Sequence, residues 1–154
     1  DLFVLPEARI SESTQLIPGT DGQKMSKSKN NTINVFLPEK ELRKQIMGIQ
    51  TDSTPLEDPK DPETCNVFAL YQLLATEKQT TELRAHYIGG NFGYGHAKQA
   101  LYELILEVFE LPRERYDHFM ANLPEIDQAL AVGAQKARKV AQEVLARVRE
   151  NLGY

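Results

Sequence analysis

The sequence IDQALAVGAQKARKVAQEVLARVRENL, residues 126–152, has the period of an amphipathic helix. Apolar or small side chains recur at spacings of three and four, which places them on one face of such a helix. This stripe comprises Ile126, Leu130, Ala134, Ala137, Ala141, Val144, Val148 and Leu152. The basic residues fall mostly off the stripe, and Gly153 follows as a helix-end signal. The C-terminal fifth of the chain therefore predicts one long helix.

Similar helical spacing occurs through most of the preceding sequence. We predict about six helices in all, within residues 38–49, 61–74, 80–87, 97–108, 112–120 and 126–152. Two short apolar runs near the start favour strands: residues 2–5, stopped by Pro6, and residues 14–17, closed by Pro18-Gly19. The predicted fold is mainly α, a helical bundle preceded by a short β-containing segment.

Composition excludes several classes of protein. The chain has 154 residues, of which 41% are hydrophobic and 26% charged, so wholesale disorder is excluded. The single cysteine, Cys65, excludes an internal disulfide, and the three scattered histidines lack zinc-site spacing. The net charge is −4, and no segment is basic enough to indicate nucleic acid by charge alone. The first residue is Asp1 rather than Met, as expected for a fragment of a longer protein.

Residues 24–28, KMSKS, lie within a polar loop that is rich in Gly, Ser and Asn. Two lysines three positions apart, with serines between them, can bind a polyphosphate through mobile ammonium groups and hydroxyl hydrogen bonds. In nucleotidyl transfer such lysines stabilise the charge that develops on the leaving pyrophosphate. The alternative is a solvated lysine-rich loop with no ligand, which composition alone favours.

The KMSKS spelling resembles the second signature motif of class I aminoacyl-tRNA synthetases. Further stretches follow in an order that resembles the bacterial tryptophanyl-tRNA synthetases, from Leu5 to the C-terminus: KMSKSKNNT at 24–32, IMGIQTDS at 46–53, CNVFALY at 65–71 and GAQKARKVA at 133–141. The related tyrosyl enzymes differ in the loop, where bacterial forms usually have Phe and Gly in place of Met25 and Ser26. Archaeal and eukaryotic tyrosyl forms tend to have serine in place of Lys27.

This resemblance implies a domain organisation and a reaction. Residues 1–35 would end a Rossmann-like catalytic domain, and residues 36–154 would form an α-helical tRNA-binding domain. The implied enzyme is a cytoplasmic homodimer that joins L-tryptophan to tRNA(Trp) with ATP and Mg²⁺. By resemblance, Lys24 and Lys27 are catalytic and contact the ATP phosphates. The ATP-binding loop consists of Lys24, Met25, Ser26, Lys27 and Ser28, with the backbone of Gln15–Ile17 bordering the adenine.

The resemblance also implies that basic residues of the last helices hold the tRNA anticodon arm. The candidates are Arg113, Arg115, Lys136, Arg138, Lys139, Arg147 and Arg149. The alternative for each is a solvated helix face. The chain has no HIGH-type signature, because Gly95-His96-Ala97 is misplaced and misspelled for one. We therefore expect the chain alone to be inactive, and monomeric or weakly associated.

Two other functions remain open at this stage. One is a tyrosyl-tRNA synthetase fragment, and the other is a free-standing helical RNA-binding module. The segment Gly89–Gly95 lacks the GxxxxGK[ST] pattern and is interpreted as a turn between helices, with Phe92 and Tyr94 anchoring it to the core. Asp52, Asp58 and Asp61 lack a regular ligand pattern, so loop capping explains them better than a metal site.

Overall fold

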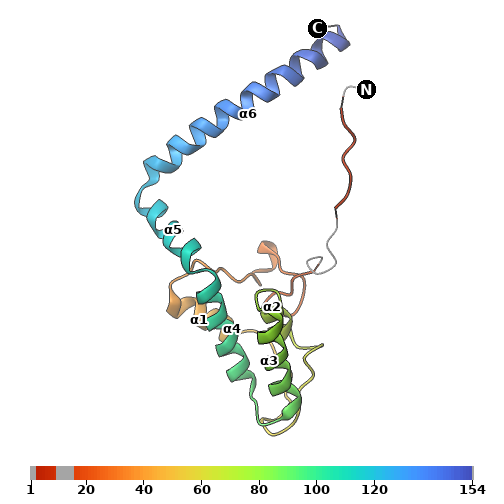
Figure 1. Ribbon diagram of the computed structural model, residues 1–154, viewed down its shortest axis with the longest axis vertical. Helices are drawn as coiled ribbons and strands as arrows, with labels where there is room; N and C mark the ends of the chain where they lie inside the picture. The colour runs from red at the N-terminus through yellow and green to blue at the C-terminus, as the bar shows by residue number, and fades with distance from the viewer. Residues whose placement is uncertain (1–2, 10–15, 154) are drawn as a thin grey trace. The chain divides into compact units, whose positions relative to one another are not determined.

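The computed structural model describes residues 3–9 and 16–153 of the chain. It divides into two compact units, Ile10–Arg113 and a unit that combines Asp1–Arg9 with Glu114–Tyr154. The described residues form one short 3₁₀ helix and six α-helices (Figure 1): η2 (Lys27–Lys29), α1 (Glu39–Met47), α2 (Asn66–Gln72), α3 (Glu77–Gly89), α4 (Tyr94–Val108), α5 (Glu110–Ala121) and α6 (Leu123–Leu152). The prediction of a mainly α fold is confirmed. No helix among them is both long enough and apolar enough to cross a membrane.

The core of the unit Ile10–Arg113 forms where α4 packs on α1 and α2, and where α2 packs on α3. Buried side chains of these helices meet there: on α1 they are Leu42 and Ile46, and on α3 Leu83 and Tyr87, each pair four residues apart on one helical face. The most deeply buried are Leu42, Ile46, Ile49, Val67, Phe68, Tyr87, Ala97, Leu101 and Ile105. Phe68 and Tyr87 meet edge to face, with ring centroids 5.3 Å apart.

The capping residues determine where the helices α1 and α3 begin. Pro38 precedes α1 as predicted. Helix α3 is longer than the predicted 80–87, because Thr76 and Gln79 form a capping box that starts it at Glu77. The Thr76 hydroxyl accepts from the Gln79 amide at 3.3 Å, and the Gln79 side chain accepts from the Thr76 amide at 2.9 Å.

The start of α2 also differs from the prediction. Asp61, the first residue of the predicted range 61–74, does not cap this helix. Its carboxylate accepts from the Glu63 amide at 2.9 Å and from the Thr64 hydroxyl at 3.2 Å, which closes a separate turn. Helix α2 therefore begins only at Asn66, because the preceding residues are committed to that turn.

The apolar stripe of α6 forms as predicted but is poorly covered. Neither α5 nor α6 has a buried residue, and Leu130 is 65% exposed. The helix begins at Leu123 with Pro124 in its first turn, and it ends at Gly153, whose φ of 79° is left-handed. An amphipathic pattern thus specifies the helix, although none of its residues is buried.

The two predicted strands are not found among the described residues. Residues 3–5 are exposed and adopt no strand, and Leu2 lies outside the described residues. Of residues 14–17, Thr14 and Gln15 also lie outside, and residues 16–17 form no strand. A strand needs a partner for its backbone groups, and the described residues contain only one isolated bridge, between Pro18 and Lys24.

Candidate functional site

The KMSKS loop is closed at its base by backbone hydrogen bonds. The Gly19 amide donates to the Gln23 carbonyl at 2.7 Å, and the Met25 amide donates to the Ile17 carbonyl at 2.8 Å. These two bonds bring the arms of the loop together on either side of Lys24, the first lysine. The segment that sequence composition describes as flexible therefore has a defined backbone path.

Asn31 is the centre of this loop and is only 2% exposed. Its side-chain nitrogen donates to the Asp21 carboxylate at 2.7 Å and to the Lys24 carbonyl at 3.2 Å. Its side-chain oxygen accepts from the Ser26 amide at 2.7 Å, and its backbone carbonyl accepts from the Thr20 amide at 2.9 Å. No feature of the sequence distinguishes Asn31, because an asparagine in a polar loop is normally solvated.

The hydrogen bonds around Asn31 also affect the pKa of Asp21. The hydrogen bond from Asn31 holds the pKa of Asp21 below its ordinary value. The Gln23 backbone amide, which donates at 3.0 Å, and the charge of Lys29 act in the same direction. Asp21 is therefore an anion at neutral pH and a constant acceptor for the loop.

The two lysines of the motif are both exposed. Neither Lys24 nor Lys27 forms an ion pair with any described residue. The hydroxyls of Ser26 and Ser28 lie 2.9 Å apart and hydrogen-bond to each other. Met25 is half-buried and packs against the hydrophobic core. In this motif the Met25 side chain thus anchors the loop to the core, and the Lys24 and Lys27 side chains extend into solvent.

The loop is attached to the helices behind it at two points. The Gln50 amide donates to the Thr20 carbonyl at 2.8 Å. Gln45 of α1 donates to the Thr32 carbonyl at 2.7 Å and accepts from the Asn34 amide at 2.9 Å. The position of the lysines is therefore coupled to the helical core of the same unit.

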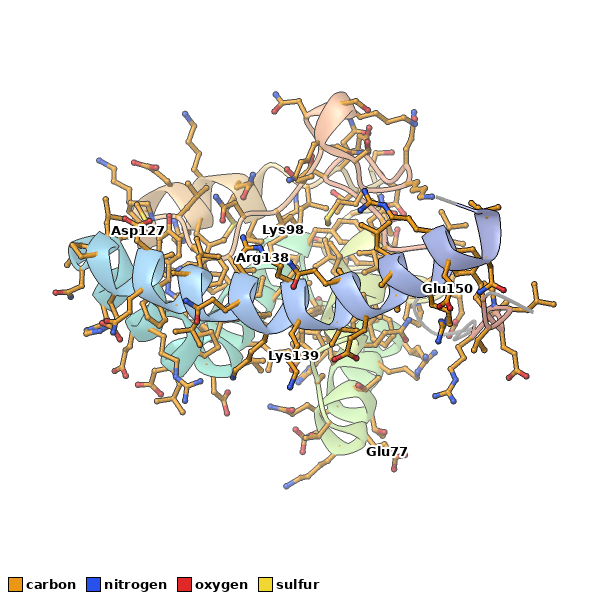
Figure 2. The ribbon with its side chains drawn as sticks, turned by 90° about the horizontal axis from the view of Figure 1, so that it is seen from above. Glu77, Lys98, Asp127, Arg138, Lys139 and Glu150 are labelled. Atoms are coloured by element: carbon orange, nitrogen blue, oxygen red, sulfur yellow. The ribbon has the colours of Figure 1, made fainter. Side chains whose placement is uncertain are left out.

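The predicted tRNA-binding residues fall in both units of the chain. Arg113 lies in the unit Ile10–Arg113, where it donates a hydrogen bond to the Val35 carbonyl. The other six candidates lie on α5 and α6, and all six are exposed. Arg138 and Lys139 extend from different sides of α6 (Figure 2). Arg113 thus has a structural contact within its unit, and all seven residues stay candidates.

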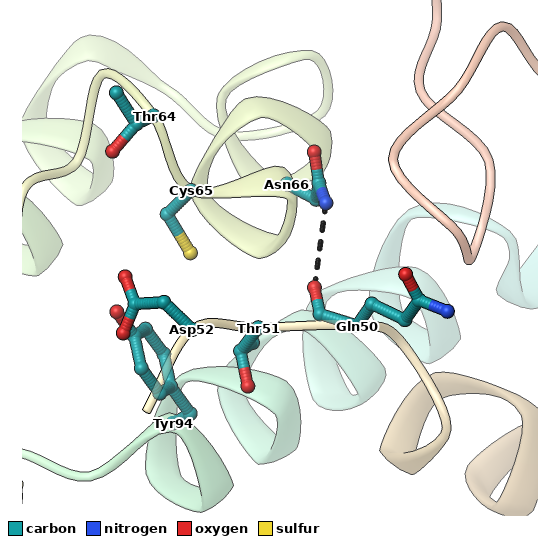
Figure 3. Close-up of a pocket in the computed structure, with 7 residues that line it drawn as sticks. All are labelled: Gln50, Thr51, Asp52, Thr64, Cys65, Asn66 and Tyr94. Atoms are coloured by element: carbon teal, nitrogen blue, oxygen red, sulfur yellow. Dashed lines mark hydrogen bonds between the residues drawn. The ribbon is translucent and has the colours of Figure 1, made fainter. Parts of the chain in front are cut away.

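A polar cavity of about 350 Å³ lies in the unit Ile10–Arg113 (Figure 3). Its lining residues are Gln50, Thr51, Asp52, Thr64, Cys65, Asn66 and Tyr94. The Asn66 side chain donates to the Gln50 carbonyl at 3.3 Å across it. Burial, with a smaller contribution from Asp52, raises the pKa of Tyr94 to about 12, so this hydroxyl stays protonated.

The acidic residues near this cavity act as caps. Asp52 accepts from the Thr54 amide at 2.8 Å, and hydrogen bonding to Thr54 lowers the pKa of Asp52. Among the described residues, no group of three or more His, Cys, Asp or Glu side chains could hold a metal ion. Capping therefore accounts for Asp52 and Asp61.

The turn predicted at Gly89–Gly95 is confirmed. Gly90 has φ of 72°, and a Cβ atom built there would lie 2.6 Å from the Glu57 carbonyl oxygen. Phe92 and Tyr94 lie against Tyr87, with ring centroids 5.8 Å and 6.3 Å from it. Both aromatic residues thus anchor the turn to the core, as predicted.

Comparison with known proteins identifies the family. A family model described as tRNA synthetases class I (W and Y) matches residues 2–110. The chain therefore belongs to the class I tRNA synthetases of the tryptophan and tyrosine group. Its relatives include a tryptophan–tRNA ligase of Campylobacter jejuni (strain RM1221), 46% identical, and one of Fusobacterium nucleatum, 44% identical, each over 153 residues. These alignments cover 99% of this chain but only 48% and 47% of the two relatives.

The structural comparison agrees with the sequence comparison. The crystal structure of tryptophanyl-tRNA synthetase from Campylobacter jejuni, complexed with ADP and tryptophan, matches with a TM-score of 0.86. The match covers 99% of this chain and 48% of that one, at 46% identity. The chain thus spans about half the length of the curated relatives it matches. The resemblance seen in the sequence is confirmed.

Proposed function

We propose that this chain supplies the C-terminal part of a tryptophan–tRNA ligase. The complete enzyme would activate L-tryptophan with ATP, releasing diphosphate, and would transfer the tryptophanyl group to tRNA(Trp), releasing AMP. The observation that carries the proposal is the defined loop on which Lys24 and Lys27 are both exposed and without a described ion-pair partner. In keeping with the resemblance, residues 1–35 complete the catalytic domain and residues 36–154 bind tRNA.

Lys24 and Lys27 would act on the phosphates of ATP. Attack of the tryptophan carboxylate on the α-phosphorus breaks the bond to the β-phosphate, and negative charge increases on the departing diphosphate. Two ammonium groups that approach this charge most closely in the transition state would accelerate the step. Met25, Ser26 and Ser28 would maintain the loop conformation from which the lysines reach. Mg²⁺ would enter the site bound to the ATP phosphates, because in such sites the ion retains waters and binds mainly through substrate phosphates.

The long helices would contact tRNA(Trp). Six of the candidates, Arg115, Lys136, Arg138, Lys139, Arg147 and Arg149, are exposed, as a phosphate-binding side chain must be. We further propose that the complete enzyme is a cytoplasmic homodimer, and that the chain alone is catalytically inactive and weakly associated at most.

The decisive experiment measures ATP–pyrophosphate exchange by the full-length protein encoded by the complete reading frame. Exchange should depend on tryptophan and not on tyrosine. Lys27→Ala should lower kcat by about 10²- to 10³-fold, the usual cost of losing one transition-state charge contact. Lys40→Ala, which removes an exposed lysine outside the loop, is the matched control. Tyrosine-dependent exchange would contradict the proposal, and so would an undiminished rate in Lys27→Ala.

A further inference from the structure

We propose that Asn31 is a positioning residue, which holds the backbone between Lys24 and Lys27 in the conformation that brings both ammonium groups to a polyphosphate. The inference rests on the proposed function and adds a residue outside the KMSKS motif. Asn31 itself contacts no substrate in this proposal. It acts through the backbone that carries the lysines.

The hydrogen bonds of the Asn31 side chain are directed at the lysine-bearing segment. One bond goes to the carbonyl of Lys24, and another comes from the amide of Ser26, which lies between the two lysines. A third bond, to Asp21, connects this segment to the opposite arm of the loop. The Asn31 carboxamide therefore holds both arms of the loop, with its nitrogen as the donor and its oxygen as the acceptor.

Burial makes this arrangement specific. Asn31 is 2% exposed, so removal of its carboxamide would leave the Ser26 amide without its partner in a partly buried position. The chain also keeps space for this side chain. A Cβ atom built at Gly19 would lie 2.4 Å from Cγ of Asn31, so residue 19 must be glycine while Asn31 occupies its site.

The side chains of the two lysines have no described restraint. Their side chains are exposed and have no described ion-pair partner, so the position of their Cα atoms decides where the ammonium groups can reach. A displacement of about 1 Å at a charge-stabilising group can cost about 100-fold in rate. A residue that fixes this backbone therefore affects the chemical step without touching the substrate.

The test compares Asn31→Ala with Asn30→Gly in the full-length protein. Asn30 is exposed and its φ of 52° suits glycine, so Asn30→Gly is a neighbouring change that preserves the backbone. In tryptophan-dependent exchange, Asn31→Ala should lower kcat by about 10- to 100-fold. Its KM for tryptophan should be unchanged, and Asn30→Gly should retain the wild-type rate. A general structural defect would instead alter tryptophan binding as well.

Asn31→Asp is a second variant, of the same size. It keeps the acceptor for the Ser26 amide but loses both donated hydrogen bonds and faces the Asp21 carboxylate, so it should also lower kcat. The inference is overturned if folded Asn31→Ala or Asn31→Asp exchanges at the wild-type rate. It is also overturned if both variants fail to fold, since Asn31 would then serve folding alone. If the wild type shows no tryptophan-dependent exchange, the proposed function fails, and this inference falls with it.

Discussion

The ammonium nitrogen of Lys60 lies 5.4 Å from the centroid of the Tyr94 ring. Lys60 is 4% exposed and has no carboxylate partner among the described ion pairs. It donates instead to the backbone carbonyls of Pro55 at 2.7 Å and Asp58 at 3.1 Å. A buried lysine thus holds the proline-rich connection between α1 and α2 against the ring.

Replacement of Lys60 should therefore destabilise the fold. We expect Lys60→Met to lower the free energy of unfolding by about 2 kcal/mol, because the carbonyl groups lose a charged donor and the ring loses its cation. Urea denaturation followed by circular dichroism measures this difference. Lys78→Met removes a lysine whose side chain is 86% exposed and should change little. Equal effects of the two substitutions would show that the buried contacts contribute nothing.

Gly90 and Gly89 allow a matched comparison of two adjacent glycines. Gly90→Ala should destabilise by about 1–3 kcal/mol, because Gly90 has positive φ and its Cβ would collide with the Glu57 carbonyl. Gly89 is the last residue of α3 and has open space around its Cβ position. Gly89→Ala should therefore be neutral or stabilising by up to about 1 kcal/mol. Thermal unfolding of both variants checks this opposite sign, and a stable Gly90→Ala protein would contradict the turn geometry.

The capping box of α3 predicts the effect of another pair of variants. Thr76→Ala removes the N-cap hydroxyl and should cost about 1 kcal/mol. Thr81 lies inside the same helix, where its hydroxyl donates to the Glu77 carbonyl at 2.8 Å. Thr81→Ala should be nearly neutral, since alanine is the better helix former. If Thr81→Ala proves the more damaging change in denaturant unfolding, α3 does not start at this cap.

The Asp21–Asn31 contact predicts a pH response of the loop. Because the folded pKa of Asp21 is lowered below 3.8, the contact contributes stability above the unfolded pKa, and this is lost as the pH falls through the folded value. In NMR titrations, the Asp21 carboxylate carbon should titrate below pH 3.8. In Asn31→Ala the midpoint should move upward, because the largest lowering contribution is gone. A wild-type midpoint at or above 3.8 would contradict the hydrogen bond.

The exposed face of α6 predicts a contrast between two leucines. Leu130→Gln should change the free energy of unfolding of this chain by less than about 0.5 kcal/mol, as is usual at exposed sites. Leu101→Ala, at a fully buried position of α4, should cost about 2–5 kcal/mol. Denaturant unfolding of the chain measures both. A large loss of stability in Leu130→Gln would mean that this face is covered.

Much of the fold and the central motif of the site follow from local sequence. The four-residue spacing of Leu42 and Ile46 predicts α1 and its buried face, because helical period and apolar burial are local properties. Pro38 and Gly153 mark helix ends for the same reason. The KMSKS spelling by itself indicates the family.

Tertiary structure alone decided which polar residues are buried and which apolar ones are not. Asn31 and Lys60 are polar residues of the kind usually found in surface loops. Each is nevertheless buried, because hydrogen-bond partners at several positions bind its side chain. The stripe of α6 has the pattern of a core helix, yet Leu130 on it is 65% exposed. A periodic sequence determines that a helix has an apolar face. Whether that face is covered depends on contacts between residues that are distant along the chain. Which amide organises a loop depends on contacts between the arms of that loop. Both kinds of contact exist only in the folded molecule.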